Sequence, residues 1–248
     1  MIELTCMTMI IDCHAHILPA MDDGAKDSAT SLEMLKASKE QGVDIVIATP
    51  HFYGDRDRME NFISRRSASF ARLKQRIEEE GEENFPQIKL GAEVAFFRGI
   101  SAAEGIENLC VEGTKVLLLE MPFAPWSNIV IDEVASLVHD RGFKVVLAHI
   151  ERYLAYKGQE EKLMQLAQIP VTFQMNAECL QSSGFFEKRR VQKLIDWFET
   201  GFVSLMGSDC HNLSSRKPNL ENGRSKLSEA TLHAIDNNAE YLMINGGR

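Results

Sequence analysis

Histidine, aspartate and glutamate recur at the ends of short apolar segments, or in the loops just after them, along this 248-residue chain. His14 and His16 end the first segment two residues apart. Because alternate side chains of a strand point to the same face, both imidazoles would lie on one side. The residues that share these positions are His14, His16, Asp23, His51, Glu93, Glu120, His149, Asp209 and His211. Imidazoles and carboxylates in this arrangement predict a metal centre rather than isolated structural histidines.

The size of this set indicates more than one ion. At about three or four protein ligands per ion, the set supplies two or three divalent ions, with carboxylates able to bridge them. Nitrogen and oxygen ligands together suit manganese, iron or zinc, and the sequence does not choose among these metals. The four carboxylates would neutralise two such ions, whereas a third ion would leave an excess of positive charge that suits a phosphate dianion. The typical chemistry of such a centre is hydrolysis, with a metal-bound hydroxide as the nucleophile.

Two arginines lie close to these residues in the sequence. Arg152 is three residues after His149, and Arg216 is five residues after His211. The planar guanidinium group matches phosphate oxygens, so both are candidates for contacts to phosphate and to the transition state. The alternative is that either arginine only forms ion pairs at the rim of the site.

Aromatic residues gather in the same loops. They are Phe52, Tyr53, Phe96, Phe97, Phe123, Trp126 and Tyr153. Such side chains could form a wall for an aromatic leaving group, or they could belong to a lid or an oligomer contact. The sequence leaves this choice open.

Cys210 and Arg216 have the spacing of cysteine-dependent phosphatases, in which a thiolate attacks phosphorus. The five residues between them lack the glycines of a tight phosphate loop. Cys210 also lies between two expected ligands, so the alternation of a strand would turn its thiol away from the metals. The sequence therefore favours metal-assisted hydrolysis over a thiolate mechanism.

Seven short apolar runs must position these residues. They cover residues 9–17, 44–49, 87–96, 116–121, 144–150, 171–177 and 203–210. Each is too short for a typical helix, and most are nearly continuously apolar, as buried parallel strands are. Helical patterns lie between them: Asp27 or Ser28 can cap one helix, and Gly42, Gly142 and Gly201 can end three. Residues 54–83 predict a long surface helix whose apolar stripe contains Ile63, Phe70, Leu73 and Ile77.

Strand and helix alternate without a linker, which predicts a parallel α/β fold. The glycine-rich patterns of nucleotide-binding open sheets are absent, so a single TIM-like barrel is favoured. We expect one domain over residues 1–248, with the first strand beginning near residue 9 and residues 1–8 as a short extension. The carboxyl ends of all strands in a parallel barrel open on the same face, where the predicted ligands would converge.

Composition limits the classes of partner. The formal net charge is −9, which disfavours nucleic acid and an anionic membrane surface as partners. No apolar stretch approaches the roughly 18 residues of a membrane helix, and the amino terminus lacks the pattern of a secretory signal. The five cysteines include no C-x-x-C pair, which fits a reduced chain and a cytoplasmic location.

The ordered motifs resemble a known family. They are His14-Ala15-His16, Asp22-Asp23-Gly24, Thr49-Pro50-His51, Gly91-Ala92-Glu93, Leu119-Glu120, His149-Ile150-Glu151-Arg152-Tyr153 and Ser208-Asp209-Cys210-His211-Asn212. Together they resemble the PHP (polymerase and histidinol phosphatase) superfamily, and in particular its bacterial tyrosine-protein phosphatases of the CpsB/CapC/YwqE type. The resemblance extends from about residue 9 to residue 245. One departure is Lys217, where a proline is expected.

The resemblance implies a distorted (β/α)7 barrel of the PHP type with three ions, manganese being favoured for activity. It assigns the ligands to three sets: His14, His16, Glu93 and Asp209; Glu93, Glu120 and His149; and Asp23, His51 and His211. Arg152 and Arg216 would be the phosphate-binding arginines. The implied substrate is the phosphotyrosine tail of a bacterial tyrosine kinase that controls capsule or exopolysaccharide synthesis, and a homo-oligomer is possible. Two alternatives remain open: a phosphatase of a small ester such as histidinol phosphate, and a non-catalytic, metal-stabilised module that binds a kinase.

Overall fold

The structure is a computed structural model that describes residues 8–181 and 187–246. Residues 1–7 of the expected extension lie outside the described residues. The strands are β1 (Ile11–Ala15), β2 (Ile45–Ala48), β3 (His51–Tyr53), β4 (Gln87–Leu90), β5 (Glu93–Ala95), β6 (Val116–Glu120), β7 (Lys144–Leu147), β8 (Thr172–Asn176) and β9 (Leu205–Gly207). Every predicted apolar run contains at least one of them.

All pairings between these strands are parallel. They form one sheet in the order β1-β2-β4 and another in the order β3-β5-β6-β7-β8-β9. The predicted run 44–49 contains only β2, and Pro50 separates it from β3, a strand that lies beyond that run; the predicted run 87–96 is divided, since Gly91-Ala92 separates β4 from β5. Proline has no amide hydrogen for a ladder, which explains the first interruption.

The ring closes between β9 and β1. A parallel bridge joins Ala15 to Cys210, and the amide of His16 donates to the Cys210 carbonyl at 2.9 Å. With β2 and β3 counted as one position and β4 and β5 as another, the strands occupy seven positions. The predicted distorted (β/α)7 barrel is confirmed.

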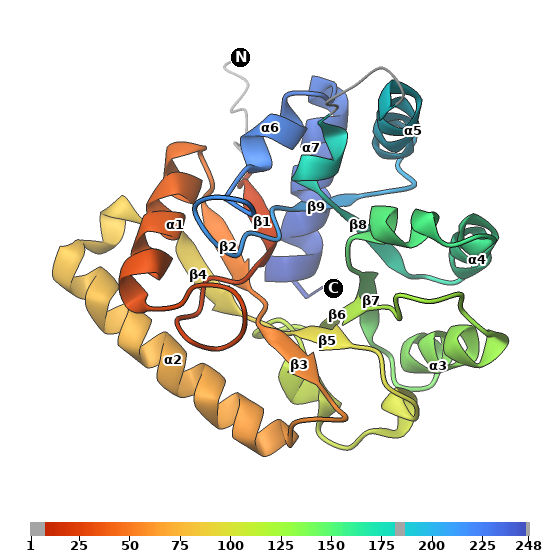
Figure 1. Cartoon of the computed structure of the whole chain (residues 1–248), viewed down its shortest axis with the longest axis horizontal. Coiled ribbons are helices and arrows are strands. Elements are labelled where there is room, and N and C mark those ends of the chain that lie inside the picture. The colour runs from red at the N-terminus through yellow and green to blue at the C-terminus, as the bar shows by residue number, and fades with distance from the viewer. Residues whose placement is uncertain (1–7, 182–186, 247–248) are drawn as a thin grey trace, which may run out of the picture.

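Most helices lie around the outside of the strands in Figure 1, whereas the last one, Glu229–Ala239, runs behind them near the middle of the picture. They are α1 (Ser28–Glu40), α2 (Met59–Glu80), α3 (Asn128–His139), α4 (Gln159–Leu166), α5 (Glu187–Glu199), α6 (Leu220–Arg224) and α7 (Glu229–Ala239). Asp27 caps α1 by accepting from the Thr30 amide at 2.8 Å. Gly42, Gly142 and Gly201 have positive φ angles just beyond α1, α3 and α5, as predicted. No helix in residues 8–181 and 187–246 combines the length and the hydropathy needed to cross a membrane.

The long helix α2 differs in detail from its prediction. Leu73 and Ile77 are buried as expected, but Ile63 and Phe70 are only partly buried. Arg66 lies in the buried stripe instead, because its guanidinium donates to the carbonyls of Gly91 at 2.6 Å and Asn108 at 2.9 Å. A simple apolar pattern does not anticipate a buried cation that is satisfied by backbone carbonyls.

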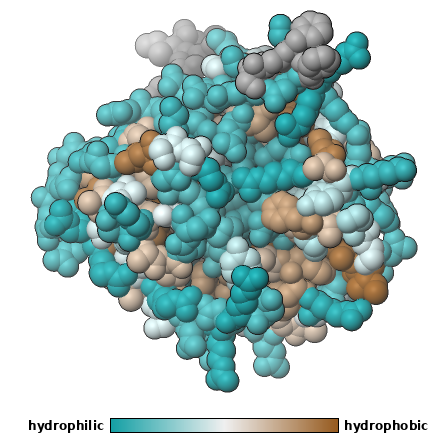
Figure 2. Space-filling model, viewed as in Figure 1, coloured by the Kyte–Doolittle hydropathy of each residue, from teal (hydrophilic) through white to brown (hydrophobic). Residues whose placement is uncertain are grey.

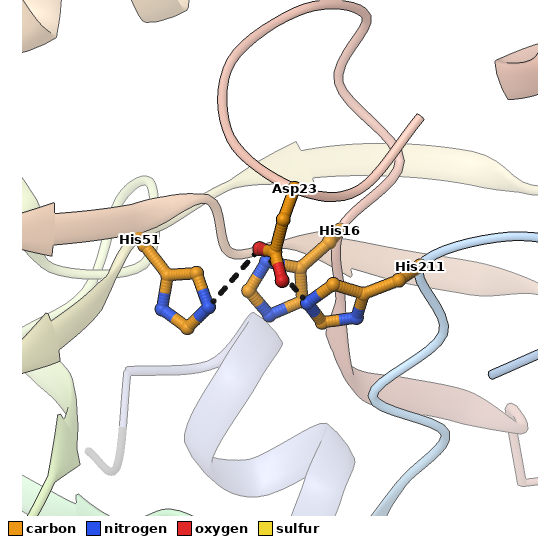
Figure 3. A group of neighbouring side chains, drawn as sticks. All are labelled: His16, Asp23, His51 and His211. Atoms are coloured by element: carbon orange, nitrogen blue, oxygen red, sulfur yellow. Dashed lines mark ion pairs between the residues drawn. The ribbon is translucent and has the colours of Figure 1, made fainter. Parts of the chain in front are cut away.

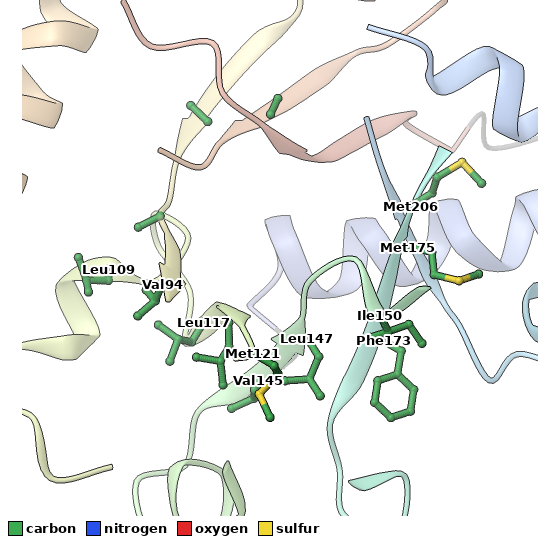
Figure 4. Close-up of a cluster of buried hydrophobic side chains, with 14 of the residues drawn as sticks. Val94, Leu109, Leu117, Met121, Val145, Leu147, Ile150, Phe173, Met175 and Met206 are labelled. Carbon is green, nitrogen blue, oxygen red and sulfur yellow. The ribbon is translucent and has the colours of Figure 1, made fainter. Parts of the chain in front are cut away.

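Two apolar clusters hold the barrel together. The larger one fills the space between strands and helices, and Figure 4 shows Leu117, Leu147 and Phe173 among its side chains. The smaller one contains residues of opposite parity, such as Val116, Leu118 and Val146, together with Leu242 and Met243 near the carboxyl terminus. Alternate residues of β6 therefore face the barrel interior and the helices, as strand geometry requires.

Candidate metal centre

Backbone irregularities turn several of the predicted ligands toward the barrel axis. In β1, the register with β2 shifts between Asp12 and Ala15, as in a β-bulge. Cys13 packs in the interior cluster whereas Ala15 packs in the outer one, so the bulge reverses the alternation and lets His14 and His16 face inward. His14 and His16 do lie together as predicted, but the regular strand assumed in the sequence argument is interrupted.

Two further predicted ligands have left-handed backbone conformations. His149 has a φ of 35° and Asp209 a φ of 52°. Residues other than glycine rarely adopt such angles, which cost about 1–3 kcal/mol each. Strain of this kind concentrates at functional sites, where neighbouring interactions hold it in place.

The structure brings all nine predicted ligands to one end of the barrel. Three groups have candidate ligand atoms within 4.8 Å of one another: His16, Asp23, His51 and His211; His14, His16 and Asp209; and His51, Glu93 and Glu120. In the first group, shown in Figure 3, an oxygen of Asp23 lies 3.5 Å from His51 Nε2 and 3.3 Å from His211 Nε2. These groups overlap with the three sets expected from the family but differ in detail: His16 and His51 each lie in two groups, Glu93 is absent from the group of His14 and Asp209, and His149 lies in none of the three.

Glu93 lies between the groups. Its Oε2 atom is 3.3 Å from His14 Nε2, 3.2 Å from His16 Nε2 and 2.9 Å from His51 Nδ1. Its Oε1 atom is 2.7 Å from His149 Nε2, which also lies 3.4 Å from Glu120. Burial alone would raise the pKa of Glu93, but the surrounding imidazoles hold it well below its ordinary value. A permanently ionised carboxylate in this position can bridge two cations.

The imidazole orientations fit cations between them. His14 Nδ1 faces Oε1, the side-chain amide oxygen of Gln174, at 3.3 Å, and His16 Nδ1 faces a carboxylate oxygen of Asp22 at 2.8 Å. Since those oxygens only accept, the two Nδ1 atoms carry the hydrogens. The two Nε2 atoms then face each other at 3.1 Å, an arrangement that needs a proton or a metal ion to be stable. His211 Nε2 and Glu93 Oε2 are buried and make no hydrogen bond to any described residue, so they are also available as ligands.

The pKa shifts describe the same electrostatic balance. Burial alone would lower the pKa values of His16 and His149, but neighbouring carboxylates raise both, that of His149 to about 9. By contrast, burial and the nearby His16 lower the pKa of His211 to about 4. Without metal, the carboxylates therefore stabilise cationic imidazoles, and divalent ions would take the place of those protons.

Three polar residues that support the ligands are absent from the sequence prediction. Asp22 accepts from His16 Nδ1 and, at 2.9 Å, from the amide of His51. Gln174 accepts from the amide of His149 at 2.9 Å, and Asn176 donates to Asp209 Oδ2 at 2.8 Å. The available signal was two polar residues at alternate positions of the otherwise apolar run 171–177.

The two predicted arginines both lie at the centre. Arg152 Nη2 is 2.5 Å from Asp209 Oδ2, and Arg216 Nη2 is 2.7 Å from Asp209 Oδ1. Arg216 Nη1 also lies 3.7 Å from Asp23. Each side chain is about 30% exposed, at 31% and 30% respectively, so the guanidinium groups border both the buried ligands and the solvent.

Comparison with known proteins now has a structural basis. A family model described as capsular polysaccharide synthesis, CpsB/CapC, matches residues 10–244. The chain belongs to the CpsB/CapC family. It is 29% identical over 245 residues to the tyrosine-protein phosphatase YwqE of Bacillus subtilis (strain 168), covering 95% of this chain and 92% of YwqE. It is 30% identical over 215 residues to the tyrosine-protein phosphatase CpsB of Streptococcus agalactiae serotype V, covering 84% and 86%.

Solved structures agree with this membership. The crystal structures of YwqE from Bacillus subtilis and CpsB from Streptococcus pneumoniae, described as unique metal-dependent tyrosine phosphatases, include a match with a TM-score of 0.79. The identity is 27%, and 95% of each chain is covered. Dihydropyrimidinase from Brevibacillus agri shares the fold alone, with a TM-score of 0.52 at 10% identity over 96% of this chain and 71% of that one. The family resemblance predicted from the motifs is confirmed.

Within this CpsB/CapC fold, the aromatic residues have different environments. Phe52, Trp126 and Tyr153 are buried and belong to the core, and the Tyr153 hydroxyl accepts from the amide of Met121 at 2.8 Å. Tyr53 and Phe123 instead stack on ligands: Tyr53 on His51 and Phe123 on His149, with ring centroids 5.3 Å and 5.8 Å apart. The Tyr153 ring also lies 5.8 Å from that of His149 but is fully buried, so of these five residues only Tyr53 and Phe123 are partly exposed beside the predicted ligands, as a wall would be.

Cys210 lies three residues after the end of β9 and is buried among apolar side chains of the larger cluster. Burial raises the pKa of its thiol far above the ordinary value. The thiol packs away from the predicted ligands, as the sequence argument expects, but β9 ends at Gly207 and Asp209 has a left-handed backbone, so regular strand alternation is not the cause. The thiolate that a cysteine-dependent phosphatase requires is disfavoured.

Proposed function

We propose that the chain is a metal-dependent phosphomonoesterase that hydrolyses phosphotyrosine in a protein substrate. The observation that carries this proposal is the convergence of five imidazoles and four carboxylates with two half-buried guanidinium groups at one barrel mouth. The relatives YwqE and CpsB, which are named tyrosine-protein phosphatases, support the same substrate class.

The proposed ligands are the nine residues predicted from the sequence. They would hold two or three divalent ions, with Glu93 as the bridging ligand and manganese favoured over iron or zinc. Such ions supply an activated water and stabilise the attacking and leaving oxygens of an in-line displacement. Four carboxylates leave a net positive charge when three divalent ions are bound, which explains how a chain of formal charge −9 accepts a phosphate dianion.

The arginines would bind the phosphoryl oxygens. Arg152 and Arg216 donate to different oxygens of the Asp209 carboxylate, so Asp209 fixes both guanidinium groups at the mouth before substrate arrives. Asn176 holds Asp209 in turn. Preorganised donors of this kind stabilise the charge that develops in the transition state without having to reorganise.

Phe123 would face the aromatic leaving group. It is 47% exposed, although it stacks on buried His149 with an interplanar angle of 18°. The ring therefore presents one surface to solvent beside the metal centre, where a tyrosine ring could pack against it. The mouth is set in a largely hydrophilic face with local apolar patches, as Figure 2 shows.

The biological substrate would be the phosphotyrosine tail of a tyrosine kinase that controls capsule or exopolysaccharide synthesis. The family description and the names of the relatives support this setting. We further propose that residues 1–248 act as one PHP-type domain in the cytoplasm.

The test is turnover by the purified chain before and after chelation. We expect hydrolysis of a phosphotyrosyl peptide, loss of activity on metal removal, and recovery with Mn²⁺. The peptide should have a higher kcat/KM than histidinol phosphate, and the reverse order would favour a small-ester phosphatase. A metal-loaded protein that turns over neither substrate nor a generic aryl phosphate would instead indicate a non-catalytic module.

A further inference from the structure

A groove of about 660 Å³ begins beside the metal centre and extends between the start of α4 and the first half of α5. These two helices lie side by side in Figure 1, and a Lys193–Glu160 ion pair joins them. The side chains that matter for the argument are Arg152, Tyr156, Lys157, Glu160, Arg190 and Lys193.

The charge of this groove differs in sign from that of the whole chain. Lys157 and Arg190 are exposed, and neither makes a hydrogen bond or an ion pair with another residue of the described ranges. Lys193 is paired with Glu160 and lies over the Trp197 ring, 5.1 Å from its centroid. The other carboxylate is that of Glu151, which is buried. Two cations therefore remain without a partner in a chain whose net charge is −9.

The groove is continuous with the proposed phosphate site. Arg152 lines the groove while its Nη2 atom contacts Asp209 in the metal centre. A peptide with its phosphotyrosine beside Arg152 would extend its next residues toward Lys157 and Arg190. Gly158 is the N-cap of α4 and lines the same groove, so the positive end of this helix lies beside it.

A second hollow indicates on which side of Arg152 the acidic residues of the peptide would lie. It is about 380 Å³ in volume, and it shares Glu151, Arg152 and Arg190 with the groove. Its lining also includes Glu178 and Glu187, two carboxylates that the groove lacks. Anionic side chains are therefore accommodated better on the α4 side, toward Lys157, than on the side of Glu178.

We propose that this groove binds acidic side chains next to the phosphotyrosine of the protein substrate. The inference rests on the proposed function and adds a preference among phosphotyrosyl sequences. The occupant is a peptide segment with aspartate or glutamate within a few residues of the phosphotyrosine. Partly exposed ion pairs of this kind contribute about 0.2–1 kcal/mol each, and two of them in the middle of that range, at about 0.3–0.7 kcal/mol each, correspond to about a threefold to tenfold change in KM.

The experiment compares three phosphotyrosyl peptides that differ only in two flanking residues: glutamate, glutamine or lysine. For the unaltered enzyme we expect the glutamate peptide to have a KM about threefold to tenfold lower than the glutamine peptide, and the lysine peptide the highest KM. The difference should shrink in high salt because exposed charges are screened. Equal KM values for the three peptides would overturn the proposal.

Variants locate the effect. The double substitution Lys157→Ala and Arg190→Ala should abolish the preference for glutamate, while kcat for p-nitrophenyl phosphate stays unchanged. The matched control is Lys74→Ala with Arg189→Ala, which removes the same charge from exposed positions on α2 and on α5 outside the groove. A preference that persists in the first variant, or that disappears equally in the control, would refute the assignment.

Two separate results distinguish this proposal from the proposed function. If neither p-nitrophenyl phosphate nor any of the three peptides is hydrolysed, the proposed phosphatase function itself is wrong. If they are hydrolysed without charge preference, only the groove assignment fails.

Discussion

Replacing Arg152 with alanine tests whether this side chain stabilises the transition state or only holds a ligand. Its Nη2 atom contacts Asp209 Oδ2, an oxygen that also accepts from Asn176 Nδ2. Asp209 therefore keeps a donor on that oxygen in the variant, and Arg216 remains on the other oxygen at 2.7 Å. We expect the carboxylate to stay in place and metal content to be preserved.

The magnitude follows from the contacts that phosphate would lose. A hydrogen bond to a charged group contributes about 1.5–3 kcal/mol, and loss of one preorganised donor in an active site costs about 2.7–4 kcal/mol. A loss near 3 kcal/mol corresponds to a decrease in kcat/KM of about two orders of magnitude. Arg152→Lys should give a smaller decrease, since an ammonium keeps the charge but not the planar fork.

The assay is steady-state hydrolysis of a phosphotyrosyl peptide, with metal content measured on the same preparations. Arg56→Ala is the control, because Arg56 lines a hollow beside Asp23 and His51 but is not among the proposed phosphate ligands. A kcat/KM within about threefold of the unaltered enzyme would refute transition-state stabilisation by Arg152, since that corresponds to under about 1 kcal/mol. Loss of activity in proportion to loss of metal would show instead that Arg152 acts by positioning Asp209.

Three further predictions concern the same centre. Metal binding near pH 7.5 should release protons, because His149, whose pKa is raised to about 9, carries a proton at that pH that a metal ion would replace. The same raised pKa stabilises the metal-free protein fully below about pH 6.5, and this contribution is lost as the pH rises through about 9. Calorimetry in buffers of different ionisation enthalpy measures the release, and buffer-independent heats would contradict it. Cys210→Ala should keep kcat while lowering stability by about 1 kcal/mol, measured by urea unfolding; an inactive, metal-loaded variant would restore the thiolate mechanism. Phe123→Ala should raise KM for aryl phosphates several-fold, by about 0.5–1.5 kcal/mol, but not for alkyl phosphates.

Much of the fold could be predicted because its signals are local. Apolar runs, the Asp27 cap and the glycines after helices each report on a few neighbouring residues, and the strands and helix ends lie where those signals indicate. The interruption at Gly91-Ala92 could not be predicted, because one continuous apolar run can form either one strand or two. Arg66 was missed because its partners, Gly91 and Asn108, are 25 and 42 residues away in the sequence.

The ligand set could be predicted because all its members have residue types that bind metals. Their supporting residues do not share that property: Gln174 and Asn176 are amides on a strand that supplies none of the proposed ligands. Their role depends on distances to His149 and Asp209 across the barrel, which one sequence does not contain. The assignment of ligands to ions likewise depends on where His16 and His51 lie between neighbouring groups.

The backbone at His149 and Asp209 connects the site to stability. Left-handed conformations at both residues cost about 2–6 kcal/mol together. An ion present at a hundred times its dissociation constant stabilises the folded state by about 2.7 kcal/mol, so two or three ions outweigh most or all of this strain. In the metal-free protein, ion pairs such as that of His149 with Glu93, 2.7 Å apart, must hold the same conformation with protons alone. His149 and Asp209 can therefore keep a backbone conformation that no local sequence preference favours, because the ions that they would bind compensate for its cost.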